Sequence, residues 1–134
     1  FKGTYNGAQV YDDYAHHPGE IAATIEAVRS MEPKRLVVAF QPHTYTRTKA
    51  LFDEFVRELQ KPDVVILAEI YAARERNTVG ISSRHLQEQI PGALYCETLP
   101  QVTARLREIA QPGDVILTVG AGDIFHAGEA LLKE

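Results

Sequence analysis

Three short, nearly uninterrupted apolar runs constrain the fold of this 134-residue chain more than any other feature. They are Leu36–Phe40, Val64–Leu67 and Val115–Val119, and each has the length and composition of a strand buried on both faces. Segments with helical periodicity, such as Ile21–Val28 and Leu51–Leu59, alternate with them. This alternation implies right-handed crossovers and a mainly parallel sheet with helices on both faces.

The start of the chain has a different pattern. Phe1–Tyr5 and Gln9–Asp12 flank Asn6 and Gly7, a favoured two-residue hairpin turn. We therefore predict one α/β domain over residues 1–134, a three-layer, Rossmann-like fold. Its mainly parallel, six-stranded sheet should carry an antiparallel hairpin strand at the N-terminal edge. The remaining predicted elements are helices within Ser82–Gln89, Val102–Ile109 and Ile124–Leu132 and a weak strand near Ala93–Cys96.

Composition argues against several classes of protein. The net charge is −4, and the 14 basic residues are scattered among 18 acidic ones, which argues against a nucleic-acid partner. No apolar run approaches the ~20 residues that span a membrane. The single cysteine, Cys96, cannot form an internal disulfide, which fits a reducing compartment, and we predict a cytoplasmic protein. The chain begins at Phe1 without an initiator methionine, which we interpret as an excised domain.

The connections between elements are of two kinds. Those from helix to strand are plain turns of proline, glycine and aspartate. Those from strand to helix are rich in histidine, arginine and carboxylates; they are Asp12–Pro18, Gln41–Thr48, Glu69–Glu75 and Gly120–Asp123. In a parallel sheet these loops share the carboxyl edge, where open α/β folds bind ligands. We therefore predict that Asp13, His43 and Gly122 converge there.

Each motif has a simpler interpretation when it is taken alone. Gly120-Ala-Gly122 lacks the third glycine of a dinucleotide fingerprint and is about equally typical of a plain turn. Asp13 could start a helix without binding a ligand. The Arg74–Arg76 run is most simply a solvated face, and isolated histidines such as His85 and His126 are more often structural.

The simpler interpretations do not account for Arg47 or for the adjacent histidines. Arg47 stands at a predicted helix start, where a cation opposes the helix dipole, so an anion is expected to join it. His16-His17 beside Asp12-Asp13 raises the question of a metal. However, neighbouring residues point in different directions and no HExxH spacing is present, so we predict no metal site formed by this chain alone.

Three motifs together carry a family resemblance. Asp12–Pro18 (DDYAHHP), Phe40–Thr48 (FQPHTYTRT) and Val119–Ile124 (VGAGDI) resemble the C-terminal domain of the Mur ligases, which build peptidoglycan precursors. The likeness extends over the whole chain. The second motif is the most specific: it resembles the members that join L-alanine to UDP-N-acetylmuramate, whereas the related murein-peptide ligase differs there.

The resemblance implies a reaction and a set of roles. ATP, with Mg²⁺, would phosphorylate the substrate carboxylate, and the amino group of L-alanine would attack the acyl phosphate. The implied site residues are Asp13 for the ATP ribose, Tyr14 beside the nucleotide, His16 as the catalytic residue near the reacting groups, His43 and Arg47 for the alanine carboxylate, and Gly120 and Gly122 for backbone contacts with the substrates.

Parts of such an enzyme are absent from the sequence. It contains no GxxxxGK[S/T] phosphate loop and no segment for a UDP-sugar. The resemblance implies that a central ATPase domain, which holds most of the ATP and Mg²⁺, and an N-terminal UDP-binding domain are the partners of this chain. The chain alone is predicted to have no ligase activity. The alternatives are a murein-peptide ligase, a nucleotide- or amino-acid-binding module without turnover, and a small metal-dependent hydrolase.

Overall fold

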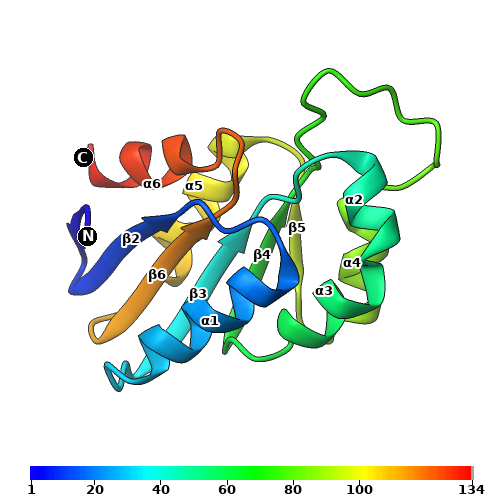
Figure 1. Cartoon of the computed structure of the whole chain (residues 1–134). Helices are drawn as coiled ribbons and strands as arrows, with labels where there is room; N and C mark the ends of the chain where they lie inside the picture. Colours follow the sequence, from blue (N-terminus) through cyan, green and yellow to red (C-terminus); the bar gives the residue numbers. More distant parts are fainter. Residues whose placement is uncertain (134) are drawn as a thin grey trace.

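The computed structural model describes residues 1–133 and contains a six-stranded sheet in the order β1-β2-β6-β3-β4-β5 (Figure 1). Within these residues β1 alone runs antiparallel, paired with β2, and the other pairings are parallel. The predicted α/β class and the N-terminal hairpin are therefore confirmed. The strands are β1 (Gly3–Tyr5), β2 (Ala8–Asp13), β3 (Arg35–Phe40), β4 (Val64–Ala68), β5 (Leu94–Cys96) and β6 (Asp114–Val119).

Helices cover both faces of the sheet and give the molecule three layers (Figure 1). One face carries α1 (Pro18–Arg29), α3 (Phe52–Glu58) and α4 (Ser83–Gln89), and the other carries α5 (Leu99–Ile109) and α6 (Phe125–Leu132). The short helix α2 (Tyr45–Ala50) follows β3 at the carboxyl edge. No helix within the described residues is long and apolar enough to cross a membrane.

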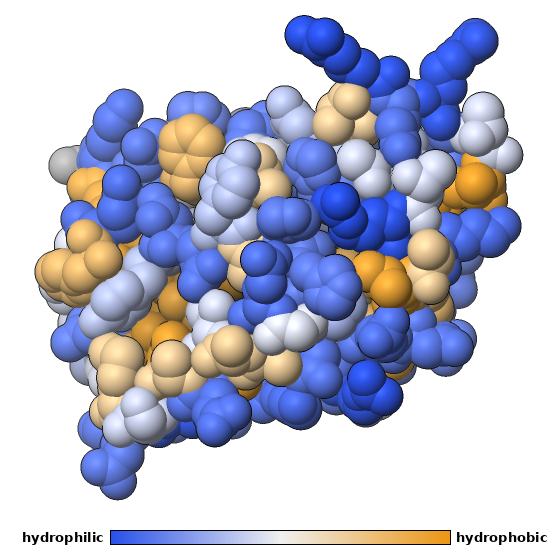
Figure 2. Space-filling model, in the orientation of Figure 1, coloured by the Kyte–Doolittle hydropathy of each residue, from blue (hydrophilic) through white to orange (hydrophobic). Residues whose placement is uncertain are grey.

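The central strands explain why continuous apolar runs predicted this architecture. In β3, Leu36, Val38 and Phe40 pack beneath α1, α3 and α4, whereas Val37 and Ala39 pack beneath α5 and α6. A strand between two helical layers buries both sets of side chains, so its sequence does not alternate. On the outside, hydrophilic residues predominate in the face seen in Figure 2, and the hydrophobic ones form small groups.

Local capping sets where α1 and α4 begin. The Gly19 amide donates to Nδ1 of His17 (3.1 Å), and the His17 amide donates to Oε1 of Glu20 (3.2 Å), which forms a capping box. Ser82 and His85 form the same arrangement at α4. His17 and His85 therefore have structural roles, which the simpler interpretation of isolated histidines predicted for His85.

The predicted helix over Leu51–Leu59 is confirmed as α3, but a separate short helix that was not predicted precedes it. Thr44 caps an earlier helix, α2, because its Oγ1 accepts from the Arg47 amide (3.3 Å). Leu51 leaves the helical conformation (φ −109°, ψ 21°) and separates α2 from α3. The apolar periodicity indicated α3 correctly but contains no signal for α2, whose buried residue is Thr48. Arg47 consequently lies in the first turn of α2, as predicted.

Candidate functional site

The strand-to-helix loops meet at the carboxyl edge of the sheet, and backbone hydrogen bonds join neighbouring loops. The Gly120 amide donates to the Asp13 carbonyl (3.0 Å), which connects the loops after β6 and β2. The Gln41 amide donates to the Val119 carbonyl (3.0 Å), which connects the loop after β3 to the end of β6. The predicted convergence is confirmed, and we call this edge the rim.

The side chain of Gln41 clamps the loop after β6. Gln41 is 5% exposed; its Nε2 donates to Oδ1 of Asp123 (2.7 Å), and its Oε1 accepts from the Asp123 amide (3.1 Å). A Cβ at Gly122 would lie 2.5 Å from Cγ of Tyr71 and 2.6 Å from Oε1 of Gln41. A Cβ at Gly120 would lie 2.8 Å from the Gln41 carbonyl oxygen. Packing within the rim therefore requires both glycines, whether or not a ligand approaches them.

His43 is surrounded by three side chains from different parts of the rim. Its ring stacks on Tyr71 with centroids 5.6 Å apart, and the His16 ring lies 5.9 Å away. Nη1 of Arg47 lies 3.4 Å from Nδ1 of His43. The fold thus brings together three predicted site residues, His16, His43 and Arg47.

This arrangement determines the protonation of His43. Burial is the main cause that lowers the pKa of His43, and the charges of Arg47 and His16 add to it, whereas Glu75 acts in the opposite direction. A guanidinium can only donate, so Nδ1 of His43 accepts from Arg47 and the neutral ring carries its proton on Nε2. The pair therefore offers an N–H group and a cation side by side.

The lowered pKa of His43 predicts how stability depends on pH. Below about pH 6.5 the unfolded chain binds a proton at this histidine more readily than the folded chain does. The free energy of unfolding should therefore fall as the pH decreases from about 6.5. Urea unfolding of the wild type and His43→Gln at several pH values measures this, because the other histidines are common to both. An identical pH dependence in the two proteins would contradict the prediction.

Asp13 lies at the end of β2, and both of its carboxylate oxygens accept hydrogen bonds. Oδ1 accepts from the Ala15 amide (2.8 Å), and Oδ2 accepts from Oγ1 of Thr24 (2.9 Å). Each oxygen retains capacity for a further hydrogen bond, so Asp13 can still accept from a ligand hydroxyl. His17 caps α1, so Asp13 is not the helix-start residue of the simpler interpretation. Its neighbour Tyr14 is 72% exposed at the rim.

The two adjacent histidines do not act together. His17 caps α1, while the ring of His16 lies beside those of His43 and Tyr14. Within residues 1–133 no group of three or more His, Cys, Asp or Glu side chains is placed to hold a metal ion.

Glu69 organises the long loop between β4 and α4. It accepts hydrogen bonds from Oγ of Ser82 (2.6 Å), the Ser83 amide (3.0 Å), the Ile70 amide (2.8 Å) and the Tyr95 hydroxyl (2.8 Å). Burial opposes ionisation, but these hydrogen bonds outweigh it and lower the pKa of Glu69. Burial and the contact with Glu69 raise the pKa of Tyr95 to about 12. Glu69 thus fixes where this loop leaves β4 and enters α4.

Glu75, in the middle of the same loop, qualifies one expectation. Its Oε1 accepts from the amides of Tyr45 (2.7 Å) and Thr46 (3.2 Å), and its Oε2 accepts from Oγ1 of Thr46 (2.6 Å). Arg74 and Arg76 are exposed, as the interpretation of a solvated face predicted, whereas Glu75 is only partly exposed and also binds the start of α2. Hydrophilic groups still project at the upper right of Figure 2, where Figure 1 shows this loop.

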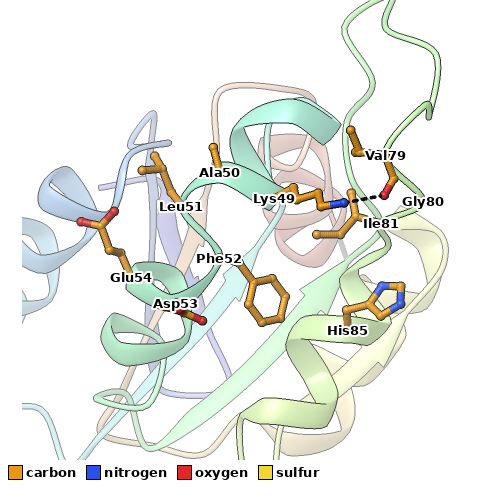
Figure 3. A pocket seen from close by; sticks show the side chains of 10 residues that line it. All are labelled: Lys49, Ala50, Leu51, Phe52, Asp53, Glu54, Val79, Gly80, Ile81 and His85. Carbon is orange, nitrogen blue, oxygen red and sulfur yellow. Dashed lines mark hydrogen bonds between the residues drawn. The ribbon is translucent and has the colours of Figure 1, made fainter.

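One cavity lies beside the rim rather than in it. It has a volume of about 600 Å³ and is lined by residues of α2, α3, α4 and the β4–α4 loop, including Phe52, Ile81 and His85 (Figure 3). Nζ of Lys49 donates to the Val79 carbonyl (3.3 Å) across one side of it. None of the predicted site residues lines this cavity. The convergent donors lie at the rim, where we place the candidate site.

Comparison with known proteins identifies the family. Residues 1–122 match the family described as Mur ligase, glutamate ligase domain. The chain belongs to the Mur ligase family. The matched residues include every predicted site residue of this Mur ligase chain.

Curated relatives cover the chain almost completely. The UDP-N-acetylmuramate–L-alanine ligase of Lachnospira eligens is 48% identical over 136 residues, which are 98% of this chain and 30% of that protein. The ligase of the same name from Acetivibrio thermocellus is 47% identical over 137 residues, which are 99% of this chain and 29% of that protein. The Mur ligase chain thus spans about 30% of the length of these relatives.

Solved structures agree with the family and the fold. The UDP-N-acetylmuramate–alanine ligase of Thermotoga maritima has a TM-score of 0.76 and 26% identity, and the match covers 96% of this chain and 26% of that one. A domain of a Haemophilus ducreyi protein, described as a UDP-N-acetylmuramate:L-alanyl-γ-D-glutamyl-meso-diaminopimelate ligase, has a TM-score of 0.71 and 25% identity. That match covers 98% of this chain and 94% of the domain, so the Mur ligase chain has nearly the same extent.

Replacing Glu69 should test how firmly the β4–α4 loop of this Mur ligase chain is held. Glu69→Ala leaves four donors without their acceptor, and Ser83 is buried. We expect the free energy of unfolding to fall by about 2 kcal/mol. Urea unfolding measures it, with Glu88→Ala, an exposed glutamate on α4, as the matched control. Equal free energies of unfolding for Glu69→Ala and Glu88→Ala would contradict this role of Glu69.

Proposed function

We propose that this chain is the C-terminal domain of an ATP-dependent ligase that joins L-alanine to UDP-N-acetylmuramate in peptidoglycan precursor synthesis. The observation that carries the proposal is the convergence of His43, Arg47 and His16 beside the Asp13 loop at one rim. The names of the Lachnospira and Acetivibrio relatives support the choice of substrates. The length of those relatives supports the presence of further domains outside this chain.

The carboxylate of L-alanine fits the His43–Arg47 pair. A guanidinium presents several N–H groups in a fixed plane that matches a carboxylate, and Nε2–H of His43 offers one more donor. Both side chains are partly buried, which strengthens their attraction to an anion relative to the same groups in water. Held in this way, the amino group of alanine would lie near His16, the residue proposed to adjoin the reacting groups.

The neighbouring loop fits the nucleoside part of ATP. Asp13 retains acceptor capacity for the ribose hydroxyls, and the exposed ring of Tyr14 is available beside them. When bound, ATP supplies the phosphoryl group that activates the sugar-acid carboxylate. The sequence contains no phosphate loop, so the ligands of the phosphates and of Mg²⁺ are proposed to lie mainly in a central domain, and the UDP group in an N-terminal one.

A turnover assay tests the proposal. The full-length protein should release ADP only when UDP-N-acetylmuramate, L-alanine, ATP and Mg²⁺ are all present, and mass spectrometry should detect the alanyl amide. ADP release with the tripeptide L-alanyl-γ-D-glutamyl-meso-diaminopimelate but not with alanine would identify a murein-peptide ligase instead. Binding of nucleotide or alanine without turnover would favour a binding module. The 134-residue chain alone should release no ADP, and release by it would refute the proposed division into domains.

A further inference from the structure

We infer that Glu75 is a positioning residue for the alanine-carboxylate site, because it holds the first turn of α2 and thereby keeps Arg47 beside His43. The inference rests on the proposed function of the His43–Arg47 pair. Glu75 itself accepts from the backbone amides of Tyr45 and Thr46 and from the Thr46 hydroxyl, so its action on a ligand would be indirect.

The first turn of α2 depends on a carboxylate from elsewhere in the chain. That turn contains no acidic residue of its own, and the hydroxyl of its capping residue Thr44 accepts from the Arg47 amide. Glu75, 30 residues further along, accepts from the Tyr45 amide and from both the amide and the hydroxyl of Thr46. Without Glu75 these donors would have no partner within the described residues.

The backbone that links His43 to α2 is strained. Thr44 has φ 68° and ψ 148°, a conformation that residues with a side chain rarely adopt. Such a conformation persists only where surrounding contacts hold it. Here the Thr44 amide donates to the Tyr71 carbonyl (2.8 Å), and the residues that follow Thr44 are bound by Glu75. Since Thr44 lies between His43 and Arg47 in the chain, its conformation sets how their side chains meet.

The conformation of the β4–α4 loop places Glu75 at the first turn of α2. Ala73 (φ 50°) and Arg74 (φ 74°) are consecutive non-glycine residues with positive φ, and the Glu75 amide closes this turn on the Ala72 carbonyl (2.9 Å). At the beginning of the loop, the Tyr71 amide donates to the Pro42 carbonyl (2.8 Å). A strained turn that aims one carboxylate at a helix start indicates a functional constraint on that carboxylate.

Kinetics of the full-length ligase test the inference. Glu75→Ala should raise the KM for L-alanine by about 10- to 100-fold, because a displacement of roughly 1 Å is enough for such a loss. The KM values for ATP and UDP-N-acetylmuramate should remain within about twofold. Glu75→Gln should restore most of the alanine affinity, since the amide oxygen can accept from Tyr45 and Thr46 and the amide nitrogen can donate to the Thr46 hydroxyl. Glu88→Ala, an exposed glutamate of α4, serves as the matched control.

A second measurement on the 134-residue chain separates this inference from the proposed function. In Glu75→Ala the amide protons of Tyr45 and Thr46 should exchange with solvent faster, whereas those of β3 should be unchanged. Unchanged exchange, or an alanine KM within about twofold of the wild type in an alanine-dependent enzyme, would overturn the role of Glu75. If the wild-type enzyme does not use alanine, the proposed function fails, and the exchange rates still decide whether Glu75 holds α2.

Discussion

Arg47→Ala in the full-length ligase is expected to raise the KM for L-alanine by about 10- to 100-fold, which corresponds to the loss of one charge-assisted contact of about 1.5–3 kcal/mol. The reason is the position of the guanidinium, 3.4 Å from the His43 ring and partly buried at the rim. Under the proposed function, its removal would leave the alanine carboxylate with the neutral imidazole of His43 as a partner. Steady-state kinetics with each substrate varied in turn measure the effect.

Two further variants make the Arg47 experiment specific. Arg47→Lys keeps the charge but loses the planar set of donors, so its KM for alanine should fall between those of the wild type and Arg47→Ala. Arg57→Ala removes an exposed arginine of α3 and should leave all KM values within about twofold. If Arg47→Ala raised the KM values of alanine, ATP and UDP-N-acetylmuramate equally, Arg47 would not be the partner of the alanine carboxylate.

Gly122→Ala should disrupt the packing of side chains within the rim. The added Cβ would lie 2.5 Å from Cγ of Tyr71 and 2.6 Å from Oε1 of Gln41, and Asp123 holds the Gln41 amide in place. Neither neighbour can yield by a simple rotation, because Cγ of Tyr71 is close to the backbone and Gln41 is buried. We expect the free energy of unfolding to fall by about 1–3 kcal/mol. Displacement of Tyr71 would also disturb His43, so the ligase should lose most of its activity.

The stability of the 134-residue chain in urea measures the effect of Gly122→Ala, and two variants control it. Gly19→Ala adds a Cβ that meets only ordinary contacts, 3.5 Å from His17, so it should change stability by less than about 0.5 kcal/mol. Adding Tyr71→Ala to Gly122→Ala removes one of the two clashes and should recover part of the stability that Gly122→Ala loses. Full stability of Gly122→Ala would show that the rim accommodates a side chain there.

The sequence predicted the sheet and its chemical edge because both follow from short-range patterns. An apolar run such as Leu36–Phe40 has only one architecture that buries every side chain, and parallel strands bring all their following loops to one edge. The positions of Asp13, His43 and Arg47 follow from that topology once the strands are located. The break at Leu51 was missed because the apolar periodicity of α3 gives no information on where the preceding polar helix ends.

The residues that sequence reasoning missed act through long-range contacts. Glu75 bonds to backbone amides about 30 positions away, and Gln41 bonds to Asp123, 82 positions away. Every residue except proline has a backbone amide. The amino-acid type at a position therefore does not reveal whether its amide binds a distant side chain. Thr24, in the second turn of α1, donates to Asp13 and was also missed. Threonine is an ordinary residue on a helix, so its type did not indicate this contact.

The order of the strands determines when the binding surface can exist. β6, the last strand of the chain, is inserted between β2 and β3, so the segments with Asp13 and His43 have no common neighbour until residues 114–119 are in place. During synthesis, a chain that ends before Asp114 carries nearly every side chain of the site but cannot align them. Such non-local pairing slows folding, and the rim can form only after β6 has paired with both β2 and β3.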